Sequence, residues 1–240
     1  MTTVKGTARL TGVAYLGLAV CGLLGLLLVR GQLVVPGDAA ATTANLVEHE
    51  TLARLGIALD LGSVLTQALV ALLFFRLFRR VNSFAAGAIA AFGLVNAVLI
   101  LVAVAFSATG LNVALGAAAA PGDRAATALL LYQLSGATWD VGGLFFGLWL
   151  IPMGWLAWRS GSMPRPLGWV LIAGGVGYIL STYVLYLAPG FAGSSALTVP
   201  ATVGELWMVG YLLWTGVRPA AAIQGNPIVE PGAAGHVATA

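Results

Sequence analysis

Three acidic residues lie within long apolar stretches of the sequence: Asp60, Asp140 and Glu205. A charged group at the depth of lipid hydrocarbon is costly, so such residues generally face the interior of a helix bundle or a water-filled cavity. Counting a rise of about 1.5 Å per residue from the helix ends places all three in the outer half of the predicted membrane region. We interpret them as candidate charge or proton sites, and we assign no residue of the chain as catalytic.

Helical spacing puts further polar residues on the same faces as these acids. Ser63 and Gln67 follow Asp60 on one helix face, and Asn96 lies in the middle of the next apolar stretch. The sequence therefore predicts a ligand or ion cavity that opens outward, with Arg54 and His49 at its mouth. The predicted cavity residues are Asp60, Glu205, Asp140, Arg54, Gln67, Asn96, His49 and Glu50.

A purely structural role is the alternative for each of these residues. Buried polar side chains also form hydrogen bonds that hold membrane helices together. A buried carboxyl group can be protonated, or it can pair with a basic residue such as Arg54. Gly143 and Gly147 form a G-x-x-x-G pattern, which permits close helix approach and which we interpret as a packing feature. Both interpretations of the polar residues stay open at the level of the sequence.

Several other chemistries lack the residues that they need. Haem and zinc sites use histidine ligands, and both histidines, His49 and His236, fall outside the apolar stretches. The sequence contains no G-x-x-x-x-G-K-[ST] phosphate loop and no H-E-x-x-H motif. Cys21 is the only cysteine, so no intrachain disulfide is possible. The basic residues lie at the ends of apolar stretches, where they indicate topology. We therefore expect no cofactor, no metal and no nucleic-acid partner.

The composition indicates what kind of element positions the polar residues. Of 240 residues, 60% are hydrophobic and 8% are charged, whereas about 25% are charged in a typical soluble domain. The mean hydropathy is +0.96. Such a chain cannot cover a soluble core with polar surface, and a helical span needs about 20 apolar residues. The composition thus predicts an all-α, polytopic transmembrane helix bundle, with the lipid bilayer as its surroundings.

Six continuous apolar stretches favour helices, because the strands of a membrane barrel would alternate in polarity. The predicted spans are residues 9–29, 52–78, 84–108, 123–158, 165–187 and 197–217. The fourth is too long for one perpendicular crossing, so we expect its first part to project outside. The predicted organisation is an N-terminal segment (1–8), a membrane domain (9–217) with an outer loop and helix at about 31–51, and a disordered tail (218–240).

The basic residues of the chain predict its orientation. Eight lie on one side of the predicted spans, whereas Arg30, Arg54 and Arg124 lie on the other. Because cytoplasmic loops are rich in Lys and Arg, both termini are predicted to be cytoplasmic. In the first outer loop, Asp38 is placed to cap a helix that runs to about Glu48. Glu50 and Arg54 then have the i, i+4 spacing of an ion pair.

A family resemblance covers the chain from about residue 9 to residue 217. The chain resembles the uncharacterised bacterial membrane proteins of domain-of-unknown-function family 4386. The stretches that carry the resemblance are Val35-Pro36-Gly37-Asp38-Ala39-Ala40-Ala41; His49-Glu50, Arg54-Leu55-Gly56-Ile57 and Asp60-Leu61; Asp140-Val141-Gly142 and Phe145-Phe146-Gly147-Leu148; Arg159-Ser160-Gly161 and Pro164-Arg165; and Gly177-Tyr178, Pro200 and Gly204-Glu205-Leu206.

This resemblance implies a multi-helix integral membrane domain in a bacterial cell membrane, and it implies no activity. The chain departs from the family pattern before the acid of the fourth span. Relatives have an aromatic or histidine-containing stretch there, and this chain has Tyr132-Gln133-Leu134-Ser135 and Thr138-Trp139. A site that depended on such a histidine would therefore be in doubt.

Three functions are compatible with the sequence. The first is binding or transport of a small solute or ion in the outward-opening cavity, with Asp60 and Glu205 as charge or proton sites. The second is a non-catalytic membrane subunit or regulator that binds a partner protein. The third is an intramembrane enzyme that acts on lipid, with Asp60, Glu205 and His49 in acid–base roles. The sequence favours a non-enzymatic role in the inner membrane of a bacterium.

Overall fold

Long α-helices make up almost the whole of the protein in the computed structural model, which describes residues 4–191 and 193–217. The described residues contain no β-strand. In chain order the elements are α1 (Val4–Leu24), the π-helical turn η1 (Gly25–Arg30), α2 (Gly31–Leu33), α3 (Ala39–Glu48), α4 (Glu50–Phe78), α5 (Ser83–Ala114), α6 (Arg124–Arg159), α7 (Arg165–Leu187), the 3-10 turn η2 (Ser195–Thr198) and α8 (Val199–Trp214).

Six of the described helices are long and apolar enough to cross a membrane. They are α1, α4, α5, α6, α7 and the continuous η2–α8 segment, and they correspond in order to the six predicted spans. The all-α class with six apolar helices is therefore confirmed, and it suggests a multi-pass membrane protein. The expected disordered tail, 218–240, lies outside the described residues.

The helix ends differ from the predicted ones mainly at the first and third spans. The first helical run begins at Val4 and passes through η1 into α2, so it ends at Leu33 and includes the start of the predicted outer loop. The α5 helix continues to Ala114, beyond the predicted end at residue 108. Hydropathy marks where a chain is apolar, whereas a helix ends where its backbone hydrogen bonds end, so the two boundaries differ.

Side-chain caps explain where several helices begin. The Asp38 carboxylate accepts a hydrogen bond from the amide of Ala41 and starts α3, as the sequence predicted. Asn82 caps α5 in the same way, through the amide of Ala85. Asp123 caps α6. Each cap satisfies backbone N–H groups that have no partner within the first helical turn.

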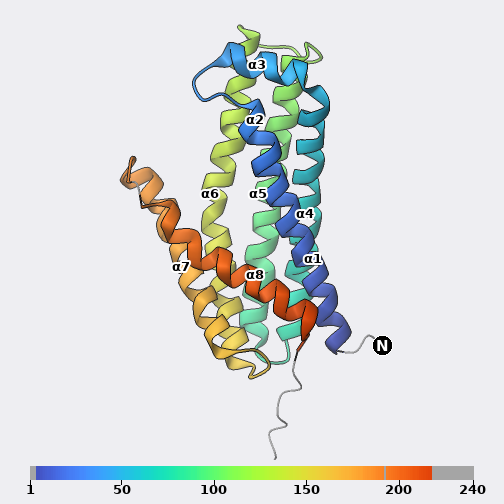
Figure 1. Ribbon diagram of the computed structural model, residues 1–240, viewed down its shortest axis with the longest axis vertical. Coiled ribbons are helices and arrows are strands. Elements are labelled where there is room, and N and C mark those ends of the chain that lie inside the picture. Colours follow the sequence, from blue (N-terminus) through green and yellow to red (C-terminus); the bar gives the residue numbers. More distant parts are fainter. Residues whose placement is uncertain (1–3, 192, 218–240) are drawn as a thin grey trace, which may run out of the picture.

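The long helices form a ring in which each packs against its neighbours in the sequence. α1 packs on α4, α4 on α5, α5 on α6, α6 on α7 and α7 on α8, and α8 closes the ring by packing on α1. In Figure 1, α1, α4, α5 and α6 stand nearly upright, with α3 across one end. The α7–α8 pair leans away from them, and α8 crosses the bundle obliquely.

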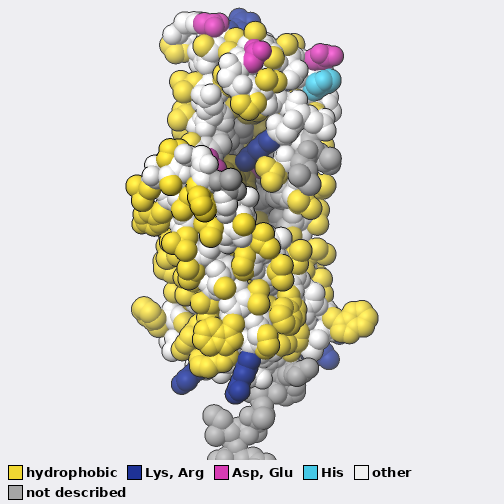
Figure 2. Space-filling view, turned by 60° about the vertical axis from the view of Figure 1, so that its left-hand side comes forward, with side chains coloured by type: hydrophobic (Ala, Val, Ile, Leu, Met, Phe, Trp, Pro, Cys, Tyr) yellow, Lys and Arg dark blue, Asp and Glu magenta, His cyan; other side chains and the backbone are white. Residues whose placement is uncertain are grey.

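Charged residues are concentrated at the two ends of the bundle. We call one the basic end; its residues are Lys5, Arg9, Arg76, Arg79, Arg80, Arg159 and Arg165. The opposite end, which carries α3, holds the acidic residues Asp38, Glu48, Glu50 and Asp123. Figure 2 shows these two ends separated by a broad belt of hydrophobic side chains, as expected for a surface in contact with lipid. It also shows a basic side chain within a hollow on the α3 side of the belt.

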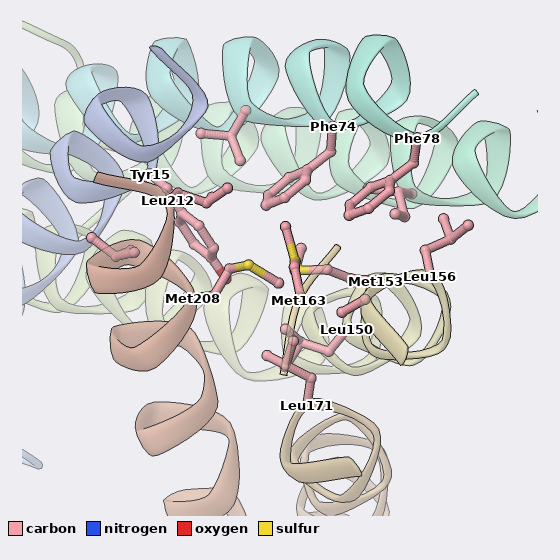
Figure 3. Packing of buried hydrophobic residues seen from close by; sticks show 14 of the residues in the cluster. Tyr15, Phe74, Phe78, Leu150, Met153, Leu156, Met163, Leu171, Met208 and Leu212 are labelled. Atoms are coloured by element: carbon pink, nitrogen blue, oxygen red, sulfur yellow. The ribbon is translucent and has the colours of Figure 1, made fainter. Parts of the chain in front are cut away.

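Two apolar clusters fill the interior. The larger one lies toward the basic end and is built around Tyr15, Phe74 and Trp149, with Met153 and Met208 beside them. Figure 3 shows Tyr15 and Phe74 in this cluster, on the side where Met208 and Leu212 of α8 enter it. The smaller cluster lies beneath α3 and includes Val29, Leu33, Leu46 and Leu111.

Polar residues separate these two clusters. Along α4, the buried residues change from Ala53 of the smaller cluster to Asp60, Ser63 and Gln67, and then to Val70 of the larger cluster. The same order holds on α5, where Asn96 and Ser107 lie between Ile89 and Leu111, and on α6, where Ser135 lies between Ala128 and Trp149. We call this zone the polar layer; its residues are Asp60, Ser63, Gln67, Asn96, Ser107 and Ser135.

Candidate functional site

The polar layer contains a buried ion pair between α4 and the π-helical turn. Nη2 of Arg30 donates to Oδ2 of Asp60 over 3.0 Å. The Asp60 residue is only 6% exposed. The pairing partner suggested by the sequence, Arg54, instead binds Glu50 over 2.6 Å at the surface. The only basic side chain shown to neutralise Asp60 within the described residues is therefore Arg30.

Two small residues bring the π-helical turn close to α4. A Cβ atom on Gly56 would lie 2.5 Å from Val29, so any larger residue there would push the two segments apart. A Cβ atom on Gly25 would lie 3.3 Å from Oδ1 of Asp60. The π-helical hydrogen-bond pattern is itself rare and is frequent at functional sites. Glycine and the altered helix register together direct Arg30 toward Asp60.

The guanidinium group of Arg30 also stacks on Trp139 of α6. Its central carbon lies 4.7 Å from the ring centroid, which is a cation–π contact. On the same helix, the Trp139 ring is stacked with Phe146, with centroids 6.4 Å apart and planes inclined by 13°. Arg30 is thus held by Asp60 through one nitrogen and by Trp139 through its face.

A cavity of about 160 Å³ surrounds this ion pair. We call it the Arg30 cavity. Its polar lining comes from Arg30, Asp60, Ser107, Tyr132 and Ser135, and its remaining lining residues are Gly25, Val29, Val34, Ala53, Gly56, Ile57 and Gly136. The cavity therefore presents charged and hydroxyl groups within a largely apolar wall, as small-ligand sites do.

Glu205 lines a different cavity, of about 140 Å³, which we call the Glu205 cavity. Oε1 of Glu205 accepts a hydrogen bond of 2.7 Å from the hydroxyl of Tyr15, and this bond joins α8 to α1. The lining residues are Tyr15, Leu18, Ala19, Gly22, Ser63, Trp139, Phe146, Glu205, Leu206 and Val209.

Asp140 lines a third and more open cavity of about 260 Å³ between α6 and the α7–α8 connection. We call it the Asp140 cavity. Its polar lining residues besides Asp140 and Trp139 are Tyr178, Ser181, Thr182, Ser194, Ser195 and Thr198. Each of the three cavities holds one of the three acids that the sequence singled out, so these acids do not share one pocket. Trp139 borders the Glu205 and Asp140 cavities and stacks on Arg30 of the first.

Gln67 and Asn96, the two residues of the polar layer with amide side chains, line none of these three cavities. Gln67 is 0% exposed and Asn96 is 1% exposed. None of their four side-chain nitrogen and oxygen atoms has a hydrogen-bond partner among the described residues. The side chain of Gln67 lies close to Gly93, and that of Asn96 lies close to Gly142. The structure thus places both amides in the interior between α4, α5 and α6.

The two residues predicted at the mouth of the cavity, Arg54 and His49, lie at the α3 end of the bundle together with Glu50. His49 is the C-cap of α3 and immediately precedes α4, and its side chain is exposed. Glu50 and Arg54 form the surface ion pair that their spacing predicted. These three residues belong to none of the three cavities described above.

A comparison with protein families finds one match, to the model described as domain of unknown function (DUF4386), over residues 10–216. The chain belongs to the DUF4386 family. This confirms the family that the sequence motifs indicated. No match is found among curated proteins or among solved structures.

Several of the stretches that carry the family resemblance have a structural reason in this DUF4386 protein. Asp38 caps α3, and Gly161 has a φ of +63° in the turn between α6 and α7, where a side chain would be strained. Gly147 packs directly on the backbone of Gly175, because a Cβ on Gly147 would lie 2.5 Å from that carbonyl oxygen. The stretches with Asp60, Asp140 and Glu205 instead line cavities.

Sequence reasoning missed three site residues of this DUF4386 protein: Arg30, Trp139 and Tyr15. Arg30 follows an apolar run and was therefore interpreted as a loop residue that signals topology. Trp139 enters the sequence argument only in the stretch that departs from the family pattern, and Tyr15 carries no motif. The close pairing of Gly25 with Asp60 and of Gly56 with Val29 is the signal that links these segments, but it is recognisable only once the helices are packed.

The described residues contain no group of three or more His, Cys, Asp or Glu side chains arranged to hold a metal ion. The chemistry available in the three cavities is therefore that of a guanidinium–carboxylate pair, a hydrogen-bonded carboxylate and several hydroxyl groups. These groups can recognise a polar ligand through hydrogen bonds and charge.

Proposed function

We propose that this protein is a multi-pass protein of the bacterial inner membrane that binds a small, net-neutral polar solute, zwitterions included, in the Arg30 cavity. The observation that carries the proposal is the Arg30–Asp60 pair, which lies inside a cavity and is fixed by Trp139. In such a pair, the guanidinium N–H groups of Arg30 and a carboxylate oxygen of Asp60 can donate to and accept from the same ligand.

The size of the cavity restricts the ligand. Pockets for drug-sized ligands measure about 300–1,000 Å³, and the Arg30 cavity measures about 160 Å³. It therefore fits a solute of only a few heavy atoms. Val29 and Ile57 supply an apolar wall, and Ser107, Ser135 and Tyr132 supply hydroxyl groups.

The charge of the ion pair favours a net-neutral ligand. Nη2 of Arg30 is bonded to Oδ2 of Asp60, and the other guanidinium N–H groups and Oδ1 supply further donors and an acceptor. An anion would bring an unbalanced negative charge into a mostly apolar cavity that already holds a neutral pair, and a buried unbalanced charge is costly. A zwitterion or an uncharged polar solute brings no such imbalance.

Three probes with a three-carbon skeleton test this proposal: alanine, propionamide and propionate. The purified protein in detergent is unfolded by heat with increasing concentrations of each probe. A bound ligand raises stability by RT ln(1 + [L]/Kd), about 2.7 kcal/mol at 100 times the Kd. Alanine or propionamide is expected to raise the unfolding midpoint through the Arg30 cavity, and propionate is not.

Paired variants assign any such effect to the cavity. The double variant Arg30→Gln/Asp60→Asn removes both charges together and leaves neither one unpaired. It is expected to abolish the response to alanine and propionamide. The matched control, Glu50→Gln/Arg54→Gln, removes the surface ion pair and should respond as the wild type does. The proposal fails if the cavity variant retains the response, or if propionate stabilises the wild type as well as alanine does.

A further inference from the structure

The Glu205 cavity contains a carboxylate whose charge is not balanced by any ion pair found in the described residues. The salt bridges found there join Arg30 to Asp60 and Arg54 to Glu50. Glu205 has the Tyr15 hydroxyl as its hydrogen-bond donor, which engages only Oε1. A carboxylate within a helix bundle that lacks a cation needs either a proton or a cationic ligand.

The Tyr15 hydroxyl is held in place by its neighbours. The ring of Tyr15 is 2% exposed and makes edge-on contacts with Phe74 and Trp149, with centroids 5.8 Å and 5.6 Å apart. Figure 3 shows Tyr15 enclosed in the larger apolar cluster beside Met208 of α8. A fixed hydroxyl that donates to Oε1 orients the carboxylate and leaves Oε2 available to the cavity.

Aromatic rings form part of the wall of the same cavity. Tyr15, Trp139 and Phe146 line it together with Glu205. Phe146 is stacked between two rings, because its centroid lies 6.4 Å from that of Trp139 and 5.7 Å from that of Tyr178. Trp139 in turn carries Arg30 on its ring. The rings of Trp139 and Phe146 are thus held by one another and give the cavity a rigid apolar wall. The other lining residues are apolar, apart from Ser63, and would contact an alkyl chain.

We infer that the Glu205 cavity is a second ligand site, which binds a small organic ammonium ion through the Glu205 carboxylate and surrounds its alkyl part with the apolar wall. A divalent metal fits less well, because Ca²⁺ and Mg²⁺ take about six oxygen ligands and Glu205 is the one carboxylate in this lining. The volume of about 140 Å³ limits the ligand to a short alkyl ammonium. The Arg30–Asp60 pair lines a different cavity, which shares no lining residue with this one.

The direct test uses propylammonium at neutral pH, with thermal unfolding of the full-length protein in detergent as the measurement. Propylammonium is expected to raise the unfolding midpoint of the wild type in a saturable manner. Glu205→Gln keeps the shape of the side chain and an oxygen that accepts from Tyr15, but it removes the charge. It is expected to weaken propylammonium binding at least tenfold.

A matched control separates this site from a general effect of cations on acidic residues. Asp140→Asn removes the acid of the neighbouring open cavity and is expected to leave propylammonium binding unchanged. Gly22→Leu, which places a side chain in the open space of the cavity and keeps Glu205, is expected to weaken binding several-fold. This variant also keeps the test decisive if Glu205→Gln does not fold.

The inference is overturned if Glu205→Gln binds propylammonium as tightly as the wild type, if Asp140→Asn rather than Glu205→Gln loses binding, or if propylammonium has no saturable effect on the wild type. In the Gly22→Leu arm, unchanged binding overturns it. These outcomes are separate from those for the Arg30 cavity, because the double variant Arg30→Gln/Asp60→Asn leaves the Glu205 cavity intact and is expected to retain the propylammonium response.

Discussion

The amides of Gln67 and Asn96 are the most unusual polar groups of the interior. Both side chains are buried within the bundle, and all four of their polar atoms lack a hydrogen-bond partner among the described residues. The indole N–H of Trp149 is in the same situation. Leaving a buried polar group unpaired costs about 1–3 kcal/mol. The interhelical hydrogen bonds that would make these amides structural are therefore not formed by the described part of the chain.

This cost predicts that the amides reduce stability. Asn96→Leu and Gln67→Met keep the approximate shape of each side chain and remove its polar atoms, so each is expected to raise the free energy of unfolding by about 1 kcal/mol. The measurement is unfolding of the purified protein in mixed detergent micelles. Ser107→Ala is the control, because the Ser107 hydroxyl already donates to the carbonyl of Val104 and its removal should not stabilise the protein. A loss of stability in both amide variants would contradict the prediction.

The hydrogen bond between Tyr15 and Glu205 shows the limit of inference from single residues. The two residues are 190 positions apart and lie on the first and last long helices of the described chain. Helical spacing indicated that Glu205 faces inward, but it contains no information about which helix it faces. The partner becomes known only when α8 packs on α1 and closes the ring.

At the scale of elements, α6 and α7 approach each other through pairs of glycines. A Cβ on Gly154 would lie 2.5 Å from the carbonyl oxygen of Gly168, and a Cβ on Gly147 would lie 2.5 Å from that of Gly175. The G-x-x-x-G pattern of Gly143 and Gly147 predicted close packing of this face. The structure shows that the contact continues along both helices at intervals of seven residues.

We predict that a methyl group at this contact separates the two helices. Gly154→Ala and Gly168→Ala should each reduce the free energy of unfolding by about 1–3 kcal/mol, the range for overpacking a close contact. Gly136→Ala is the control on the same helix, because a Cβ there meets nothing within 4 Å. It should be neutral or stabilising by up to about 1 kcal/mol through helix propensity. The free energy of unfolding is measured in detergent for all three variants. Equal changes in this free energy at the three positions would contradict the packing argument.

The elements were predictable to different degrees, for physical reasons. Hydropathy and caps depend on local sequence, so the order of six apolar helices, the Asp38 cap and the Glu50–Arg54 pair were correctly predicted. The inward direction of the Arg30 side chain was not predicted. Face prediction assumes about 3.6 residues per turn, and the π-helical turn immediately before α2 departs from that period. Arg30, the last residue of this turn, therefore points in a different direction from the one its spacing indicates.

At the scale of the whole molecule, the polar layer lies between two apolar clusters rather than at the surface. The cluster beneath α3 closes the interior at one end, and the cluster around Tyr15, Phe74 and Trp149 closes it at the other. The Arg30 and Glu205 cavities are lined in part by residues of this layer. Val29 and Ala53 of the cluster beneath α3 line the Arg30 cavity, whereas Tyr15, Leu18 and Val209 of the larger cluster line the Glu205 cavity. The Arg30 cavity is therefore the one nearer to α3.

The orientation of the molecule decides which compartment the α3 end faces. The basic residues gather at the end opposite α3, and cytoplasmic loops are enriched in Lys and Arg. We therefore predict that α3 faces the outside of the cytoplasmic membrane and that the α4–α5 turn faces the cytoplasm. Single cysteines can test this in a Cys21→Ala background. Glu48→Cys and Val81→Cys both lie at exposed positions, one at each end.

In intact cells, a membrane-impermeant maleimide is expected to label Glu48→Cys, and it should label Val81→Cys only after the cells are made permeable. The Cys21→Ala protein, without a cysteine, gives the background. Labelling of Val81→Cys alone in intact cells would reverse the orientation and would place the α3 end in the cytoplasm. Labelling of both positions would contradict a single orientation. Because the orientation is argued from charge placement, this measurement determines whether the α3 end, beneath which the Arg30 cavity lies, faces the outside of the cell.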